Sequence, residues 1–514
     1  MLVKTYCAAV NGLSVNTVTV EISVESGMKF ILSGLGDEAV RESLGRIASA
    51  VGYSGFKFPH KAITINLAPA NIRKEGSAYD LPMAVGLLAA DESIVSDKLH
   101  EYMLIGEIGL DGKLKPVTGV LPIAILARKE KFKGLIVPKE NAREAAVVNN
   151  LEVYGMETLL EVVQFLSGQT DAEPLIVDTR KVFYEQQAET TELDFADVKG
   201  QEFVKRAMEV AAAGGHNLIM VGPPGSGKSM MAKRLPSILP PLSLAESLET
   251  TQIHSVAGKL GTDQSLIYRR PFRAPHHTIS QVALVGGGAT PKPGEISLAH
   301  NGVLFADELP EFSKSTLEVL RQPLEDRKIT ISRAKYTLEY PCSFMFVASA
   351  NPCPCGYYGD RTHNCICTPG QIHRYMSKIS GPMLDRIDIQ CEIQAVPFAQ
   401  LAQLKPGESS AVIRQRVIAA RKIQEERFKD FKDIHCNAQM TEKLLKIFAV
   451  PDDQSLEMLR MAMEKFRLSA RAYSRILKVA RTIADLAGLE TIGFNQIAEA
   501  VGYRNLDRSD WAER

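Results

Sequence analysis

The stretch that decides the fold is Asn217-Leu-Ile-Met-Val-Gly-Pro-Pro-Gly-Ser-Gly-Lys-Ser229, an apolar run followed by a glycine-rich loop. The apolar run predicts a buried strand, and the residues after the loop predict a helix. Glycines in such a loop let backbone N–H groups close around phosphate oxygens, and the helix N-terminus adds positive potential. We therefore predict a nucleotide-binding loop made of Gly222, Pro223, Pro224, Gly225, Ser226, Gly227, Lys228 and Ser229.

The end of this loop carries the chemistry of phosphoryl transfer. The Lys228 ammonium can reach the β and γ phosphates of ATP, and the Ser229 hydroxyl is a ligand for Mg²⁺. Further along the chain, the apolar run 302–306 ends in Asp307 and Glu308. A lone strand end of this kind is usually just solvated, but after a phosphate loop we predict that Asp307 holds Mg²⁺ and Glu308 polarises the attacking water. The expected cofactors are ATP and Mg²⁺.

Three later residues are further candidates for the same site. Asn351 follows the apolar run 344–349 and could hold the lytic water, or it could simply open a turn. Arg386 begins a predicted strand and is a candidate catalytic arginine of the kind usually supplied by a neighbouring subunit, although a surface Arg–Asp pair is the alternative. Arg471 begins a predicted helix and could reach the phosphates, or it could belong to a solvated basic face.

Predicted elements divide the 514 residues into three units. Residues 1–167 mix short β-rich runs with helical patterns, and the polar stretch 168–192 is typical of a linker. Residues 193–397 alternate strand and helix, as in a parallel sheet, and include a cysteine-rich insertion, whereas residues 398–514 show only helical patterns. The sequence thus predicts the α/β class, with an α/β N-terminal domain, an α/β core that carries the phosphate loop, and a helical C-terminal lid.

Composition favours a soluble cytoplasmic enzyme. Charged residues make up 23% of the chain, and 60 basic residues balance 60 acidic ones. No overall field therefore attracts nucleic acid or a membrane surface, and any polyanion must be bound by a local basic patch. The first residues lack the pattern of a signal peptide, and no stretch approaches the roughly 18 apolar residues of a membrane span. We expect no membrane partner.

Four of the eight cysteines are clustered, as Cys353, Cys355, Cys365 and Cys367. In a reducing cytosol such a cluster indicates metal binding rather than disulfides. Four thiolates can form a closed tetrahedral Zn²⁺ site, although one intervening residue within each pair is tighter than the usual two to four. We therefore predict a structural zinc site. Unligated loop cysteines are the alternative, and His363 is an alternative ligand.

Three further segments point to a family: Arg273–His277, Gly286–His300 and Leu320–Glu325. With the nucleotide elements, they resemble the magnesium-chelatase-like AAA+ ATPases over essentially the whole chain, and among these the bacterial competence DNA helicases. The resemblance implies a homohexameric ring that drives branch migration of DNA while incoming single strands recombine with the chromosome during natural transformation. An ATPase that remodels a protein partner, as the chelatase motor subunit does, is the alternative. The nucleotide-site positions that the resemblance implies are Lys228, Ser229, Asp307, Glu308, Asn351, Arg386 and Arg471.

Residues 327–339, between Glu308 and Asn351, alternate as a β-hairpin does. In AAA+ machines of this type such a hairpin enters the pore of the ring, where Lys and Arg hold DNA phosphates without reading bases. Arg333 and Lys335 are therefore the candidate DNA contacts. An exposed, charged hairpin tip is the alternative.

The N-terminal domain resembles the proteolytic domain of Lon-type proteases in the segments Lys74–Ala84, Gly106–Gly119 and Ile136–Asn141. In this alignment Ala78 replaces the nucleophilic serine and Leu121 replaces the lysine of the catalytic dyad. Serine-type peptidolysis needs an activated hydroxyl. The resemblance therefore implies a scaffold without proteolytic activity.

Overall fold

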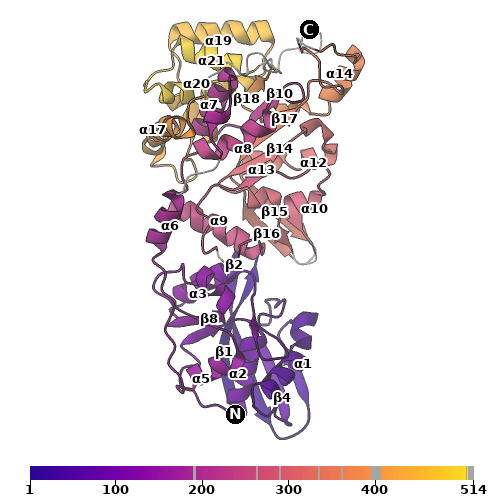
Figure 1. Cartoon of the computed structure of the whole chain (residues 1–514), viewed down its shortest axis with the longest axis vertical. Coiled ribbons are helices and arrows are strands. Elements are labelled where there is room, and N and C mark those ends of the chain that lie inside the picture. Colours follow the sequence, from indigo (N-terminus) through magenta and orange to yellow (C-terminus); the bar gives the residue numbers. More distant parts are fainter. Residues whose placement is uncertain are drawn as a thin grey trace.

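The computed structural model describes residues 1–188, 193–261, 264–288, 291–333, 336–360, 363–394, 407–504 and 506. The molecule is elongated, with an N-terminal unit (residues 1–167) at one end and a helical unit (residues 407–504) at the other (Figure 1). A central unit (residues 193–394) lies between them and contains a parallel sheet. The α/β class with a helical C-terminal region is thus confirmed.

A seven-stranded sheet in the order β3-β4-β2-β1-β5-β8-β9 forms the N-terminal unit. β1 and β2 pair antiparallel around a turn at Gly12, whose φ of 64° favours glycine. β2 buries alternate residues, because successive side chains of a strand point to opposite faces. The elements of the N-terminal unit are β1 (Leu2–Asn11), β2 (Ser14–Glu25), β3 (Phe30–Ser33), α1 (Glu38–Tyr53), β4 (Ala62–Ala68), α2 (Asp80–Ala90), β5 (Tyr102–Leu104), β6 (Glu107–Ile108), β7 (Leu114–Lys115), α3 (Val120–Lys129), β8 (Gly134–Pro138), α4 (Lys139–Ala145), β9 (Glu152–Met156) and α5 (Leu159–Leu166).

The two positions that align with the protease dyad carry no catalytic group. Ala78 borders a cavity of about 310 Å³, and Leu121 is fully buried in α3. The neighbouring Ser77 hydroxyl donates a hydrogen bond to the Glu107 carboxylate. Since neither a methyl nor an isobutyl group can attack a peptide or accept a proton, we expect no peptidase activity from this unit.

The segment predicted as a linker contains a helix, α6 (Thr179–Ala188). Phe183 on this helix is buried in the apolar cluster of the N-terminal unit, and the Thr179 hydroxyl donates to the carbonyl of Val147 at 2.8 Å. A weakly periodic, polar sequence did not indicate this helix, which is stabilised by packing rather than by its own amphipathic pattern.

Five parallel strands in the order β11-β14-β17-β10-β18 form the sheet of the central unit. Four of them, β10 (Leu218–Val221), β14 (Val303–Ala306), β17 (Met345–Ala350) and β18 (Ile389–Glu392), lie where apolar runs predicted them. The fifth is the short edge strand β11 (Phe272–Arg273). β10, β14 and β17 are buried along their whole length, as is usual for a parallel sheet covered on both faces.

Helices and two antiparallel hairpins surround this sheet. The predicted hairpin is confirmed as β15 (Lys328–Arg333) and β16 (Tyr336–Pro341), in which Lys328 pairs with Pro341. A smaller hairpin joins β12 (Gly286–Gly287) to β13 (Lys292–Pro293). The helices are α7 (Glu202–Gly214), α8 (Lys228–Ile238), α9 (Leu244–Val256), α10 (Gln281–Val285), α11 (Glu295–Leu298), α12 (Lys314–Glu318), α13 (Arg321–Asp326), α14 (Pro369–Met376) and α15 (Gly381–Leu384), with 3₁₀ turns η1 (Phe195–Asp197) and η2 (Leu309–Glu311).

The helical unit agrees closely with the predicted helices. Asp452 and Ser469 cap the N-termini of α19 and α20, each accepting a hydrogen bond from a backbone N–H in the first turn. Within the described part of the chain, no helix has the length and apolar character needed to cross a membrane. The elements are α17 (Ser410–Phe428), η3 (Asn437–Gln439), α18 (Glu442–Phe448), α19 (Asp453–Phe466), α20 (Ala470–Leu486) and α21 (Phe494–Gly502).

A buried polar network joins the central sheet to the helical unit. Asp388, just before β18, pairs with Arg475 of α20 at 2.8 Å and lies 3.2 Å from the Nδ1 of His216. Burial alone would raise the pKa of Asp388, but Arg475 and His216 outweigh it and hold this pKa below its usual range. The other ring nitrogen of His216 lies 2.8 Å from the hydroxyl of Thr482 on α20.

The N-terminal unit also packs directly on the central unit. The backbone N–H of Gly119 donates to the carbonyl of Ser255 at the end of α9, and the Ser255 hydroxyl donates to the buried Glu144. Leu242 and Leu266 of the central unit belong to the apolar cluster of the N-terminal unit. These contacts bring the α3 end of the N-terminal unit against α9.

A second contact between these units involves the β1–β2 turn. Leu13 packs against an apolar cluster of the central unit that includes Tyr340 of β16 and, at its margin, Leu338. A Cβ added at Gly12 would lie 3.4 Å from the side chain of Leu338. The turn therefore rests on the β15–β16 hairpin.

We expect Asp388→Ala to destabilise the protein by about 3 kcal/mol, because it leaves the Arg475 charge and His216 without their buried partner. The matched control is Asp385→Ala, whose partner Arg471 has a side chain 68% exposed and lies 3.2 Å away. That exposed pair should contribute less than about 1 kcal/mol. Urea unfolding of both variants measures the difference, and equal losses would show that the Asp388 network does not hold the helical unit in place.

Candidate nucleotide site and cysteine centre

The phosphate loop follows β10 and leads into α8, which begins at Lys228. Gly225 and Gly227 have φ values of 75° and 91°, a region that residues with a side chain rarely adopt. A Cβ at Gly222 would lie 2.2 Å from the carbonyl oxygen of Ile393, so this glycine is required for the close packing of the loop on β18. The loop conformation thus explains why these positions are glycine.

Lys228 lies inside the curve of the loop. Its Nζ donates to the carbonyls of Gly222 and Pro223 at 2.7 and 2.9 Å and lies 3.3 Å from the Oδ1 of Asn351. Burial lowers the pKa of Lys228, and the nearby Asp307 and Glu308 carboxylates partly offset this effect. Asn351 reaches this position because Val221 of β10 pairs with Ala350 of β17, so both strands end at the same level.

The acidic pair after β14 lies beside the loop. The Ser229 hydroxyl donates to Asp307 Oδ2 at 2.8 Å. The Ser349 hydroxyl donates to the other oxygen of Asp307 and accepts a hydrogen bond from the backbone N–H of Glu308 at 3.1 Å. A hydroxyl and a carboxylate at this separation are the oxygen ligands that Mg²⁺ takes beside substrate phosphates. Ser229 and Asp307 fit the predicted Mg²⁺ site.

Glu308 has a left-handed backbone, with φ of 53°, which is unusual for a residue with a side chain. Its carboxylate is 53% exposed and lies 3.9 Å from the Nδ1 of His277. The His277 ring in turn lies against Phe312 and stacks beside His276. Sequence reasoning did not place His277 at the nucleotide site. To predict that His277 lies beside the acidic pair, one would have to know the path of the loop after β11.

Within one chain, Arg386 and Arg471 do not lie beside the phosphate loop and the acidic pair. Arg386 precedes β18 and pairs with Glu325 at 2.6 Å, and Arg471 pairs with Asp385. Both lie at the amino-terminal edge of the sheet, whereas the phosphate loop is at its carboxyl-terminal edge. The four residues of β10 alone separate the two edges by about 13 Å.

The clustered cysteines come together directly after Asn351. The four sulfur atoms of Cys353, Cys355, Cys365 and Cys367 all lie within 4.8 Å of one another. The Sγ of Cys365 is 3.7 Å from that of Cys353 and 3.6 Å from that of Cys355. A tetrahedral Zn²⁺ with Zn–S bonds of about 2.3 Å holds its sulfurs about 3.8 Å apart, so the cluster fits such an ion. His363 is not part of the cluster, and its ring stacks on Tyr357.

The loop that carries the clustered cysteines packs against the phosphate loop. A Cβ added at Gly356 would lie 2.7 Å from the ring of Pro224. Gly356 has a φ of 87° and lies one residue after Cys355, so a metal that orders the cysteines also fixes the segment in contact with the phosphate loop. The cysteine centre is therefore well placed to support the phosphate loop.

Of the two predicted DNA contacts, Arg333 is the last residue of β15, and Lys335 lies outside the described residues. The hairpin itself connects α13 to β17, between the acidic pair and Asn351. The assignment of DNA contacts to it stays a prediction.

We predict about one zinc per chain and its loss in the double variant Cys365→Ser/Cys367→Ser. Because the cysteine loop packs on Pro224, the variant should also bind ATP about tenfold more weakly, or ~1.4 kcal/mol. Metal analysis and nucleotide titration measure the two effects, with Cys7→Ser as the control outside the cluster. Fully active protein purified without zinc would refute the assignment.

Family comparisons agree with this geometry. Residues 194–401 match the family described as "Magnesium chelatase, subunit ChlI", residues 20–141 match "Subunit ChlI of Mg-chelatase", and residues 407–504 match "Magnesium chelatase, subunit ChlI C-terminal". The N-terminal unit is also similar to Lon protease 2 of Bacillus subtilis, with 31% identity over 159 residues, which covers 28% of this chain and 27% of that protease.

Two relatives are similar over nearly their whole length. Competence protein ComM of Haemophilus influenzae is 44% identical over 506 residues, which covers 98% of this chain and 97% of the relative. YifB of Escherichia coli is 43% identical over 500 residues, which covers 97% and 96%. The chain therefore belongs to the magnesium-chelatase-like family of AAA+ ATPases that includes ComM and YifB.

Proposed function

We propose that this protein is an ATP-driven DNA motor, a helicase or branch-migration translocase, that promotes integration of single-stranded DNA by homologous recombination during natural transformation. The observation that carries the proposal is the 44% identity to a competence protein over 98% of the chain, combined with the assembled nucleotide site. The protein would act in the cytoplasm, where its DNA substrates and ATP are found.

In the proposed reaction each group has a role that follows from its position. The loop N–H groups and Lys228 bind the β and γ phosphates, and Ser229 and Asp307 hold Mg²⁺. Bound Mg²⁺ neutralises phosphate charge. Glu308 accepts a proton from the attacking water, and the Asn351 amide orients that water toward the γ-phosphate. The hydrogen bonds from Ser349 to Asp307 and from the Glu308 N–H to Ser349 hold the Asp307 carboxylate and the Glu308 backbone in a fixed relative position.

A homohexameric ring would complete this site. Arg386 and Arg471 lie at the sheet edge opposite the phosphate loop, which supports their action on the nucleotide of a neighbouring subunit. In a closed ring every subunit presents this edge to the next subunit's loop. The arginines would then release Glu325 and Asp385 and contact the phosphates at the interface.

The proposed DNA contacts are Arg333, the last residue of β15, and Lys335, which lies outside the described residues. With 60 basic and 60 acidic residues, the protein needs a local basic element to bind a polyanion. In sequence the hairpin lies between the acidic pair and β17, the strand that Asn351 follows, and this position would couple it to the nucleotide site.

The second candidate is an ATPase that remodels a protein partner. The family description as a magnesium chelatase subunit favours this candidate. The ATPase rate with and without single-stranded and forked DNA separates the two. A DNA motor should hydrolyse ATP faster with DNA, and a rate that no DNA changes would favour the protein remodeller.

We predict that mixing two inactive variants, Lys228→Ala and Arg386→Ala, restores part of the ATPase activity. If Arg386 acts on the neighbouring subunit, roughly a quarter of the interfaces in a random ring join an intact loop to an intact arginine. The control mixture is Lys228→Ala with Glu308→Gln, which never yields an intact site because both residues serve the same loop. Absence of rescue in rings of mixed subunits would place Arg386 outside the shared site.

We also predict that Arg333→Ala/Lys335→Ala weakens DNA binding at every sequence while basal ATPase activity stays near normal. Loss of phosphate contacts should flatten the dependence of affinity on salt by nearly one unit of slope per contact. The control is Lys328→Ala, whose charge is already paired with Glu339 at 3.2 Å in the same hairpin. Unchanged slope and undiminished DNA stimulation would move the DNA contact to another surface.

A further inference from the structure

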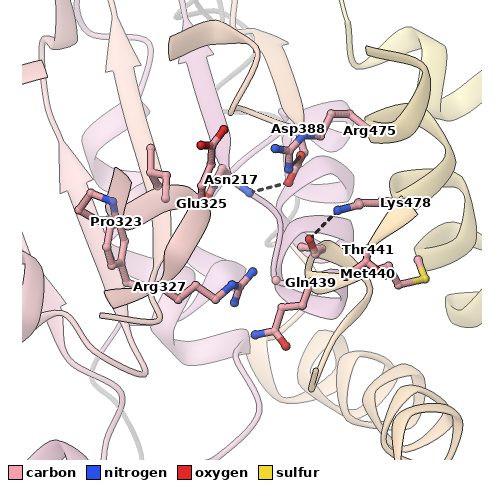
Figure 2. Close-up of a pocket in the computed structure, with 14 residues that line it drawn as sticks. Asn217, Pro323, Glu325, Arg327, Asp388, Gln439, Met440, Thr441, Arg475 and Lys478 are labelled. Atoms are coloured by element: carbon pink, nitrogen blue, oxygen red, sulfur yellow. Dashed lines mark hydrogen bonds and ion pairs between the residues drawn. The ribbon is translucent and has the colours of Figure 1, made fainter. Parts of the chain in front are cut away.

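A polar pocket of about 250 Å³ lies at the sheet edge opposite the phosphate loop, where three parts of the chain meet. Asn217 and Asp388 come from the ends of β10 and β18, Arg327 from the turn between α13 and β15, and Arg475 and Lys478 from α20. Figure 2 shows Arg327 reaching across the pocket toward Gln439, with Lys478 on the opposite wall. None of these residues belongs to the proposed nucleotide site of this chain.

Positive charge in the pocket exceeds negative charge. Arg327, Arg475 and Lys478 face two carboxylates, and both carboxylates are already paired, Asp388 with Arg475 and Glu325 with Arg386. Arg327 donates only to the Ser343 hydroxyl at 3.2 Å, and Lys478 only to the Ala438 carbonyl at 3.1 Å. In the parts of the chain that the structure describes, neither has a carboxylate partner.

Burial makes this excess unfavourable. Removal from water, with repulsion from the neighbouring Arg475, lowers the pKa of Lys478 to about 8, although Asp388 partly offsets this effect. Burial also lowers the pKa of Arg327, with Cys436 and Asp388 raising this pKa and Arg421 and Arg475 lowering it. An unpaired charge removed from water costs several kcal/mol unless an opposite charge joins it. The pocket therefore favours an anion.

Two details indicate that the cationic side chains are positioned to bind an anion. Arg327 is the C-terminal cap of α13, with a left-handed backbone (φ of 54°) whose N–H donates to the carbonyl of Pro323, so the end of this helix fixes where the Arg327 side chain begins. Arg421 lines an adjoining pocket that shares Arg327 and Gln439, and its buried Nε has no hydrogen-bond partner among the described residues. Donors thus face these pockets from two sides.

We propose that this pocket is a binding site for an oxyanion of the phosphate class, with Arg327 and Lys478 as its principal ligands. A guanidinium presents paired N–H donors and an ammonium presents three, so together they match the several acceptor oxygens of a tetrahedral oxyanion. The ligand is inorganic phosphate or the phosphate end of a nucleotide.

The position of the site gives the anion a defined effect. Arg327 is adjacent to Lys328, the first residue of β15, and Lys478 belongs to α20 of the helical unit. A bound oxyanion would connect the base of the hairpin to the helical unit across the edge of the sheet. It would thereby limit movement between these parts.

The test measures thermal unfolding of the full chain during titration with phosphate, at constant ionic strength maintained with chloride. Lys228→Ala serves as the parent background, so that the phosphate loop contributes little. The parent should gain stability with rising phosphate, because a ligand that binds the folded state stabilises it. Adding Arg327→Gln/Lys478→Gln should weaken the apparent phosphate affinity at least about tenfold. Adding Lys446→Gln/Arg460→Gln, which removes the same charges from exposed positions, should leave it unchanged.

A second titration with ADP distinguishes the two sources of phosphate. A response to phosphate alone identifies the inorganic ion, and a response to ADP that Arg327→Gln/Lys478→Gln abolishes identifies a nucleotide. Since the substitutions remove unpaired buried charge, the variant should be at least as stable as the control in chloride, and the single variant Lys478→Gln should show an intermediate loss of affinity. Equal responses of parent and pocket variant to both phosphate and ADP would overturn the proposal.

Discussion

The register in which the parallel strands β14, β17 and β10 pair determines where the groups of the nucleotide site lie. Ala306 pairs with Ala348 and Val221 with Ala350, so β10 and β17 end level and β14 ends two residues earlier. Whatever residue follows each strand must therefore project at the same edge. Asp307 and Asn351 come from parts of the sequence far from the phosphate loop, yet this register brings Asp307 within hydrogen-bond distance of Ser229 and Asn351 within hydrogen-bond distance of Lys228.

The same sheet gives the molecule a second edge of different character. At the amino-terminal end the chain gathers Arg386, Arg471, Asp388 and the cations of the oxyanion pocket. The chain thus carries a nucleotide-binding edge and an edge rich in basic groups. In the ring proposed above, two copies placed head to tail would bring these two edges together.

Much of this organisation could be predicted from the sequence, because local patterns specify it. The apolar run 303–306 coincides with β14, and the glycines of the phosphate loop indicated both a turn and a ligand. Contacts between segments far apart in sequence could not be predicted. Ser349 was visible as a strand end but not as a partner of Asp307, and His277 acquires meaning only beside Glu308. No local sequence pattern indicates the oxyanion pocket, which brings together Asn217, Arg327 and Lys478.

The contact between the β1–β2 turn and the β15–β16 hairpin has a consequence for truncated forms of the protein. Leu13 packs against the apolar cluster that includes Tyr340, Gly12 lies beside Leu338, and the N-terminal unit also shields Leu242 and Leu266. Truncation to the central and helical units would expose this apolar surface to water, and such patches promote aggregation. The N-terminal unit is thus an integral cover of the ATPase rather than a detachable module, which gives a reason for a protease-like fold to persist after its dyad is lost.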